Sequence, residues 1–547
     1  MSFQQRTLIA LALCALIFVL FDWLMPKPEP PPETEQAVAT ETSDGKEAKR
    51  EAKSPDAKVE EEEEPAPSGE HVDSEERELR NELVAVRIVN RSPAKGGIVA
   101  GIQLLSPQFE KELTGTDALR LGGSPTLEVS FADEESDVKL PKSTTFELRD
   151  EGPRHVTLGH RDNEVDVTER FELGEGYEAK LVVTVTNRSK AAKAHRIHIG
   201  TRVGVVDSRY DIARGLCRTG EDLEYEDASD VEDGPIHYTG PITWGGVDNK
   251  YFGFFVIATQ PATDCEIRLA EGGGFVQNRI SGAVVSLEPG ASQTYEYGLY
   301  LGAKELERLQ SYSAVQVKGL DIDQAIDWGF FGGVSEWLGR MLLGMLRWFF
   351  AVTHSWGISI VLLTVVVKLI TLPLTLKQMS SMKRMRAINP EMQKIRAKYA
   401  DDRVKQGQEM QALFARSGVN PLAGCLPTLV QLPIWFALYS MLSAAVELVH
   451  QKFLWLPDLT QQDPFYILPL ALGGLMIVQN RMMPNTMDEA QAKMMRWLMP
   501  IMFTLFMLFL PSGLAVYIFA NILLSIVQTA IQVGVGGKEQ PAAGKPA

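Results

Sequence analysis

The sequence predicts a multi-span α-helical membrane protein with six transmembrane helices and a large exported all-β sandwich domain. Long apolar stretches lie at the very start of the chain and after residue 328, whereas short alternating runs separated by turn residues fill most of the segment between them. The net charge of -16 is carried mainly before residue 318. The mean hydropathy of -0.05 therefore averages two dissimilar parts.

The first 78 residues predict an N-terminal anchor followed by a tether. The apolar run in residues 1–25 has about the ~20 residues that a bilayer-crossing helix needs, and Arg6 precedes it. Bulky residues follow its apolar core, so no cleavage site for a signal peptide is expected. Residues 26–78 are rich in Pro, Glu, Ala and Lys and almost lack aromatic residues. Such a segment cannot bury enough apolar surface to fold, which predicts a disordered acidic tether.

Residues 79–318 are expected to form the β-sandwich domain. Short alternating runs bounded by Gly, Asn, Asp and Pro predict strands at 83–89, 179–185, 251–258, 283–287 and 293–301. His195 and His198 would point to opposite faces of a strand, so they do not predict a site. Cys217 and Cys265 lie in this exported domain, where a disulfide is permitted, but the sequence leaves their pairing open.

The second half predicts an interfacial helix and a five-span core. Residues 319–355 contain apolar residues at helical spacing with Arg340 and Arg347 between them, which is typical of an amphipathic helix lying at a membrane surface. The core is expected at 356–533 and a short tail at 534–547. Its predicted spans are 356–376, 421–447, 464–482, 497–510 and 514–533.

The positive charges predict the topology. The loop 377–418 carries an excess of Lys and Arg and therefore belongs in the cytoplasm, whereas the loop 448–463 has one fixed positive charge, Lys452, and suits the outside. Six spans then leave both termini in the cytoplasm and the β-domain outside.

Lys368 lies near the middle of a predicted span, where a charge costs at least about 2.5–3.5 kcal/mol and suggests a function. The alternative is that the lysine reaches the membrane surface. The cytoplasmic end of the span is roughly 12 Å away, however, about twice the length of the side chain. A water-filled cavity open to the cytoplasm is the better explanation.

Further polar residues occupy the same spans. Hydrogen bonds between helices would explain one or two of them, but polar positions on several spans together with a central cation favour a hydrophilic groove. The predicted groove residues are Lys368, Thr364, Gln431, Tyr517, Asn521, Ser525 and Gln528.

The cytoplasmic loop 377–418 reads as a hairpin of two helical arms, with an aspartate pair as a cap between them and a break at Asn389 and Pro390 in the first arm. Adaptable methionines beside cations suit the capture of apolar segments, and a basic helix on the lipid surface fits equally well. The residues concerned are Met379, Met382, Lys383, Arg384, Met385 and Arg386.

No phosphate-binding loop, zinc motif or nucleophile elbow is present in the sequence. We therefore expect neither a metal nor a cofactor, and a protein that is not an enzyme.

Three stretches carry a family resemblance: SWGISIVLLTVVVKLITLPLTLKQMSSMKRM from Ser355, NPLAGCLPTLVQLPIWFALY from Asn420, and FLPSGLAVY from Phe509. With them the chain resembles the YidC family of membrane insertases, relatives of the mitochondrial Oxa and chloroplast Albino proteins. The arrangement of anchor, tether and exported domain is similar to the long Gram-negative form. That likeness implies a multi-pass protein of the bacterial cell inner membrane whose periplasmic domain is galactose-mutarotase-like.

The resemblance also implies a function. Members receive nascent transmembrane segments in a positively charged groove and release them into the membrane, alone or with the Sec translocon. Thr364, Gln431 and Tyr517 match groove positions, and Lys368 stands where most members carry Arg. The implied partners are nascent membrane proteins, the Sec translocon and anionic lipids. The ribosome is a further partner, although the tail after residue 533 has few basic residues. DNA is not expected.

Two other functions are compatible with parts of the sequence. A small-anion transporter or channel would use Lys368 as the counter-charge and the β-domain as a receptor, but no inverted repeat supports it. An exported carbohydrate-active enzyme with an anchor would leave the five-span half unexplained.

Overall fold

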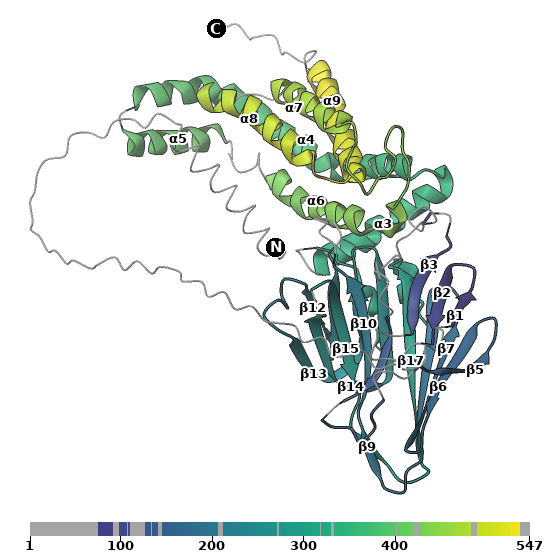
Figure 1. Ribbon diagram of the computed structural model, residues 1–547. Coiled ribbons are helices and arrows are strands. Elements are labelled where there is room, and N and C mark those ends of the chain that lie inside the picture. Colours follow the sequence, from purple (N-terminus) through teal and green to yellow (C-terminus); the bar gives the residue numbers. More distant parts are fainter. Residues whose placement is uncertain are drawn as a thin grey trace, which may run out of the picture. The chain divides into compact units, whose positions relative to one another are not determined.

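The computed structural model describes residues 75–90, 98–106, 108–109, 126–132, 134–140, 145–205, 212–270, 273–317, 319–329, 333–400, 402–418, 426–482 and 489–536. The predicted anchor at 1–25, nearly all of the tether and most of the tail lie outside these residues. The described part contains a β region followed along the chain by a helical region (Figure 1).

The β region is built from antiparallel sheets. A three-stranded sheet joins β1 (Glu76–Arg80), β2 (Val84–Val89) and β3 (Val99–Leu104). A twelve-stranded sheet has the order β12 (Asp222–Asp227), β11 (Arg214–Thr219), β13 (Ile236–Asp248), β14 (Phe252–Leu269), β17 (Ser292–Ala303), β8 (Glu178–Asn187), β7 (Val165–Leu173), β6 (His155–Arg161) and β5 (Glu147–Glu151), with β10 (Ile197–Gly204), β15 (Phe275–Ser281) and β4 (Glu128–Phe131) branching from it. The short strands β9 (Lys193–His195) and β16 (Val285–Leu287) form a separate pair.

The alternation of apolar and polar residues that predicted the strands also identifies which face of the sheet packs into the core of the β region. Alternate residues of β7 and β8 are buried, including Val167, Leu181 and Val183, so one face of the sheet packs inward. All five predicted strands are present as β2, β8, β14, β16 and β17.

The expected end of the tether at residue 78 is wrong. Strand β1 begins at Glu76, and its Leu79 is buried opposite Val86 of β2. The polar composition of β1 does not predict a strand. The segment is nevertheless a strand because it forms backbone hydrogen bonds with β2.

The cysteines and histidines of the β region have structural roles. Cys217 and Cys265 form a disulfide that joins β11 to β14, which settles the pairing left open by the sequence. His195 and His198 are both buried, and each meets a hydroxyl, of Tyr295 at 2.8 Å and of Ser281 at 2.7 Å. They lie on different strands and form no common site.

The helical region contains α2 (Leu306–Gln310), η3 (Ile322–Ala325), α3 (Gly333–Thr353), α4 (Trp356–Lys398), α5 (Arg403–Ser417), α6 (Leu426–Ala444), η5 (Val446–Leu448), α7 (Ile467–Met482), α8 (Glu489–Met507) and α9 (Ser512–Gly536). Within the described residues, each span predicted after residue 355 contains a helix, namely α4, α6, α7, α8 and α9 in chain order. Among the described residues, two segments are long and apolar enough to cross a membrane, Trp356–Lys377 and Ser512–Ile531, and three shorter apolar helices accompany them. The count of six spans therefore stays a prediction.

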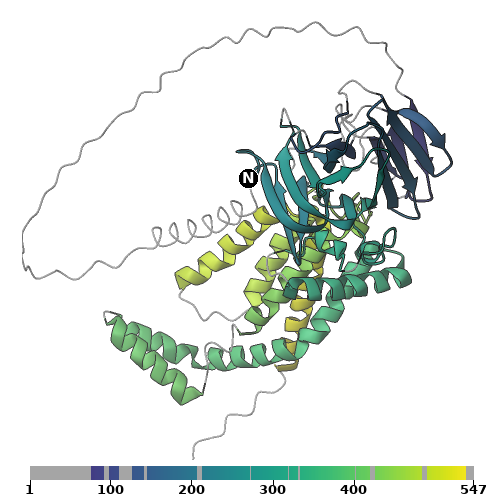
Figure 2. The ribbon, with the colours of Figure 1, turned by 90° about the horizontal axis from the view of Figure 1, so that it is seen from below.

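The predicted break at Asn389 and Pro390 is also wrong. Helix α4 continues through Pro390 to Lys398, and α5 then folds back beside this part of α4 (Figure 2). Proline removes one hydrogen bond, but the strong helix formers around it keep the helix going. The expected cap is present, because the Asp402 side chain accepts a hydrogen bond from the Lys405 amide at 2.9 Å.

Candidate functional site

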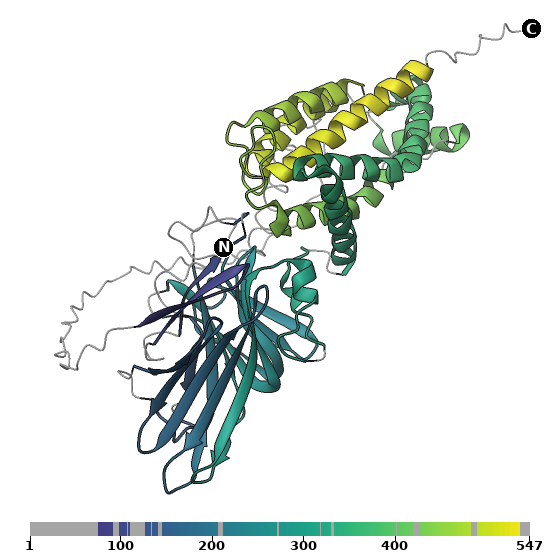
Figure 3. The same ribbon diagram turned by 90° about the vertical axis from the view of Figure 1, so that its right-hand side faces the viewer.

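A line of polar contacts joins α4 to α9, which run side by side in the same direction (Figure 3). The Lys368 Nζ donates to the Ser525 Oγ at 2.7 Å, and the Ser525 hydroxyl in turn donates to the Asn521 carbonyl at 2.7 Å. Further along both helices, the Gln528 amide donates to the Thr375 Oγ1 at 3.0 Å. Between the two helices the structure therefore joins Lys368 to Ser525, and Gln528 to Thr375, which the sequence reasoning missed. Asn521 takes part through its backbone carbonyl.

Lys368 lies at the border between the buried and the exposed faces of α4. Its neighbour Val367 is buried, whereas Leu369 and Ile370 are 61% and 65% exposed. The lysine itself is half-buried, and within the described residues it makes no ion pair. A half-buried cation that is held by a hydroxyl alone keeps the capacity to attract an anion.

The remaining predicted groove residues are placed differently. Thr364 and Tyr517 are each 1% exposed, and the Thr364 hydroxyl donates to the Ile360 carbonyl of its own helix. Both side chains are therefore buried inside the helical region. Thr364 precedes Lys368 by four residues on α4, and Tyr517 precedes Ser525 by eight residues on α9. Gln431 lies on α6, but its side chain is outside the described part of the structure.

The predicted capture hairpin consists of α5 and the C-terminal part of α4. Leu413 of α5 and Met392 of α4 are buried, and the Gln406 amide donates to the Arg396 carbonyl at 3.1 Å. Of the six hairpin residues singled out in the sequence, Arg384 is exposed and Met385 half-buried. The side chains of the other four, Met379, Met382, Lys383 and Arg386, lie outside the described part.

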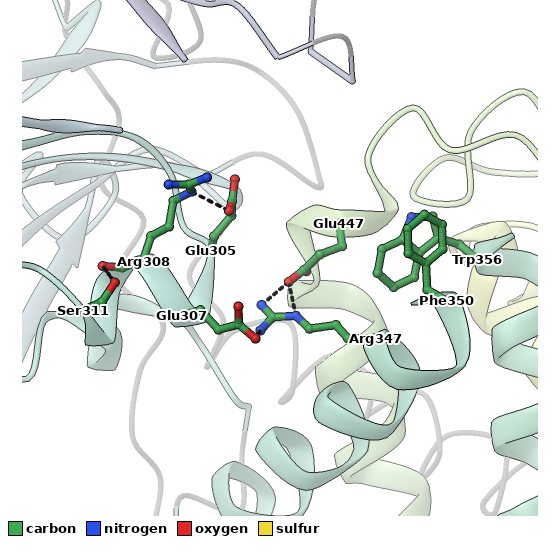
Figure 4. Close-up of a pocket in the computed structure, with 8 residues that line it drawn as sticks. All are labelled: Glu305, Glu307, Arg308, Ser311, Arg347, Phe350, Trp356 and Glu447. Atoms are coloured by element: carbon green, nitrogen blue, oxygen red, sulfur yellow. Dashed lines mark hydrogen bonds and ion pairs between the residues drawn. The ribbon is translucent and has the colours of Figure 1, made fainter. Parts of the chain in front are cut away.

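A second charged cluster joins α2, the first helix after the β region, to the later helices, and the sequence reasoning did not anticipate it. Arg347 of α3 contacts Glu307 of α2 at 2.8 Å and also pairs with Glu447, which follows α6 (Figure 4). Phe350 and Trp356 stack beside this cluster with ring centroids 4.1 Å apart. The cluster borders a cavity of about 450 Å³ lined by Glu305, Glu307, Arg308, Ser311, Arg347, Phe350, Trp356 and Glu447.

Glu447 was assigned to a span, which concealed its role. Helix α6 ends at Ala444, so Glu447 lies beyond it and is free to pair with Arg347. An acidic residue at the end of an apolar run was the signal available in the sequence. Two glutamates hold the one arginine, so the cluster is a joint between α2, α3 and the segment that follows α6.

Comparison with known proteins assigns both regions to one family. Residues 348–534 match the family model described as 60Kd inner membrane protein, and residues 105–343 match the YidC periplasmic domain. The membrane protein insertase YidC of Geobacter sulfurreducens is 35% identical over 371 residues, which cover 66% of this chain and 67% of that protein. The chain belongs to the YidC family. It is accordingly an inner membrane protein with a periplasmic β-domain.

Other YidC relatives match over a smaller share of their length. The membrane protein insertase YidC of Anaeromyxobacter sp. strain K is 41% identical over 342 residues, covering 62% of this chain and 59% of the relative. The match thus spans less than two thirds of that protein. These relatives are named as membrane protein insertases and not as enzymes, which agrees with the expectation from the sequence.

Solved structures give weaker likenesses. An active YidC insertase matches over 84% of this chain and 93% of its own, at 19% identity and a TM-score of 0.37. A galactose mutarotase related enzyme from Lactobacillus acidophilus matches over 42% of this chain and 97% of its own, at 11% identity and a TM-score of 0.31. Both TM-scores are too low to establish a shared fold, so the galactose-mutarotase-like character of the β-domain stays a prediction.

Proposed function

We propose that this YidC-family protein is a membrane protein insertase and chaperone. It receives nascent transmembrane segments in a cationic hydrophilic groove along α4 and α9 and releases them into the inner membrane. The observation that carries the proposal is the Lys368 contact with Ser525, which leaves a cation inside the longest apolar helices with a hydroxyl as its partner. Lipid alone gives no reason to maintain such a charge.

The chemistry is solvation of the polar flank. The free energy of moving an apolar segment into the bilayer is favourable. The polar residues next to that segment, its flank, lose hydrogen bonds to water when they cross the hydrocarbon layer. In this proposal Lys368 pairs with acidic groups of the flank, and Asn521, Ser525 and Gln528 offer hydrogen bonds. Thr364, Gln431 and Tyr517 complete the groove wall.

The hairpin 377–418 is proposed as the capture arm. Its methionines, Met379, Met382 and Met385, adapt to varied apolar segments. Its cations, Lys383, Arg384 and Arg386, suit anionic lipid and ribosomal RNA. Photocrosslinkers at Met382 and Met385 should label a nascent chain before one at Tyr517 does. If both methionine probes gave only lipid adducts, the hairpin would be a surface helix and not a capture arm.

The proposed topology has six spans and places both termini in the cytoplasm. Anionic lipids, the Sec translocon and the ribosome are proposed partners beside the nascent membrane proteins. Because the tail has few basic residues, ribosome contact would fall to the cytoplasmic loops.

Depletion of the protein tests the proposal against the small-anion transporter. Failed insertion of small membrane proteins, measured by protease protection in the depleted cells, is the expected result. Crosslinking from Gln528 to an arrested nascent chain should then place the substrate beside Lys368. Loss of uptake of one anion with normal insertion would support the transporter instead.

A further inference from the structure

The loop that follows η5, residues 449–466, caps the first turn of α9; we call it the outer loop. The Ser512 and Gly513 amides donate to the carbonyls of Gln461 and Leu459, each at 2.7 Å, and the Ser512 hydroxyl donates to the Asp458 carbonyl at 2.8 Å. These amides belong to the helix N-terminus and have no partner inside the helix. The outer loop is therefore bound to α9 by three hydrogen bonds.

The outer loop also covers the beginning of α4. The Phe453 ring lies directly on Gly357, and a side chain at Gly357 would overlap that ring. At Gly513 a side chain would lie 3.0 Å from the Leu459 carbonyl oxygen. Leu459 is itself buried. Glycines thus let the outer loop approach both helices closely and close the space over their first turns.

This closure lies on the same two helices as the polar contacts of Lys368. Along α4 the distance from Gly357 to Lys368 is about 16 Å, and along α9 the distance from Gly513 to Ser525 is about 18 Å. In the proposed topology the outer loop faces the periplasm. A polar group held at Lys368 therefore has the outer loop between itself and the outer side of the membrane.

The backbone of the outer loop is strained at three places. His450, Leu454 and Tyr466, near its start, in its middle and at its end, have positive φ angles of 57°, 55° and 55°. Each such residue costs about 1 kcal/mol or more and persists only where its surroundings enforce it. Asp458 provides part of that enforcement, because it accepts two hydrogen bonds from Thr460 and contacts His450 at 3.2 Å.

We propose that the outer loop is a latch that must release the first turn of α9 before a long polar flank can leave toward the periplasm. The proposal rests on the proposed insertase function. The hydrogen bonds at Ser512 and the packing of Phe453 on Gly357 hold the latch closed, and the strained residues are the points at which it bends. The latch thereby makes insertion selective for flank length, since a flank of a few residues needs no such opening.

A disulfide across the latch tests this. Gln461→Cys with Ser512→Cys, in a background with Cys14 and Cys425 replaced by Ala, is oxidised in proteoliposomes and supplied with two substrates that differ only in the length of the polar periplasmic flank. We expect oxidation to slow insertion of the long-flank substrate by about tenfold or more. The short-flank substrate should insert at the parental rate, and reduction should restore the long-flank rate. The single-cysteine variants and the reduced parent are the controls.

The outcomes separate the latch from the function. Equal rates before and after oxidation would overturn the latch, and so would equal slowing of both substrates, since the bond would then only distort the helices. Failure of both substrates in the parent would instead count against the insertase. Phe453→Ala needs no disulfide and should speed the long-flank substrate. If Phe453→Ala changes neither rate in a folded protein, the packing on Gly357 holds nothing closed.

Discussion

The β region and the helical region each contain a lysine that is largely shielded from water. The first of these lysines contacts a carboxylate, and the second contacts a hydroxyl. Lys304 is buried, and its Nζ lies 2.8 Å from a carboxylate oxygen of Asp248, which also pairs with Arg214 at 2.7 Å. Lys368 has a hydroxyl at a similar distance and, among the described residues, no carboxylate. A buried charge with a complete set of partners serves the fold, whereas one without a counter-charge remains available to a ligand.

The largest expected effect is on the paired lysine. Asp248→Asn removes the carboxylate and leaves Arg214 and Lys304 as uncompensated neighbours, which should cost about 3–5 kcal/mol of unfolding free energy. Hydrogen exchange of the β11 and β14 peptides in the full-length protein measures it. Lys304→Met is the matched control and should cost less, because Asp248 keeps Arg214. If hydrogen exchange in Asp248→Asn were the same as in the parent, the carboxylate beside Lys304 would not stabilise the fold, and the proposed difference between Lys304 and Lys368 would be wrong.

Substitutions of Lys368 should have the next largest effect, which is on the rate of insertion and not on stability. Lys368→Ala and Lys368→Glu should slow insertion of substrates with acidic flanks by about tenfold, which corresponds to about 1.4 kcal/mol. Lys368→Arg should insert them at the parental rate. Hydrogen exchange should be unchanged, since no carboxylate loses its partner. Parental insertion by the Ala and Glu variants would show that the charge has no role.

A further expected effect is the dependence of stability on pH. Glu169 of β7 is buried, its carboxylate oxygens have no partner within the described residues, and burial raises its pKa from 4.5 to about 8. The folded state therefore holds a proton between about pH 4.5 and 8 that the unfolded state releases, so stability falls as pH rises through this range. Glu169→Gln should flatten that dependence and raise the melting temperature at the alkaline end. Parallel pH profiles for both proteins would contradict this.

The smallest expected effect is on insertion after removal of the β-domain. A deletion that ended at residue 290 would leave β17 without its neighbours β8 and β14, so the deletion should cover residues 75–317. Arg347 would lose Glu307 and keep Glu447. Insertion of a short-flank substrate should continue at the parental rate. Complete loss with normal expression would mean that the joint at Arg347 carries more than a structural contact.

The sequence predicted what depends on local pattern. Short apolar runs with alternating residues predicted β8 and β17, and the depth of Lys368 in an apolar run identified it as a candidate. Contacts between distant residues could not be read in this way. Ser525 lies 157 residues from Lys368, and their meeting depends on how α4 and α9 pack.

The same limit applies to the β region. Cys217 and Cys265 lie 48 residues apart on β11 and β14, and both strands pair with β13, whose pairing with β14 changes register between Thr239 and Trp244. No propensity scale predicts such a bulge. The rule that proline interrupts a helix gave a wrong prediction at Pro390, because the surrounding residues favour the helix strongly enough to continue it.

Helix α4 has a mechanical consequence. It is one continuous rod of 43 residues, about 65 Å long, with Gly357 near one end and the hairpin arm at the other. Because α4 is unbroken between these two places, a displacement of the arm would be transmitted toward the end where Phe453 rests on Gly357. A force on the proposed capture arm would thus reach the opposite end of the helix, with Pro373 as the natural point of flexure.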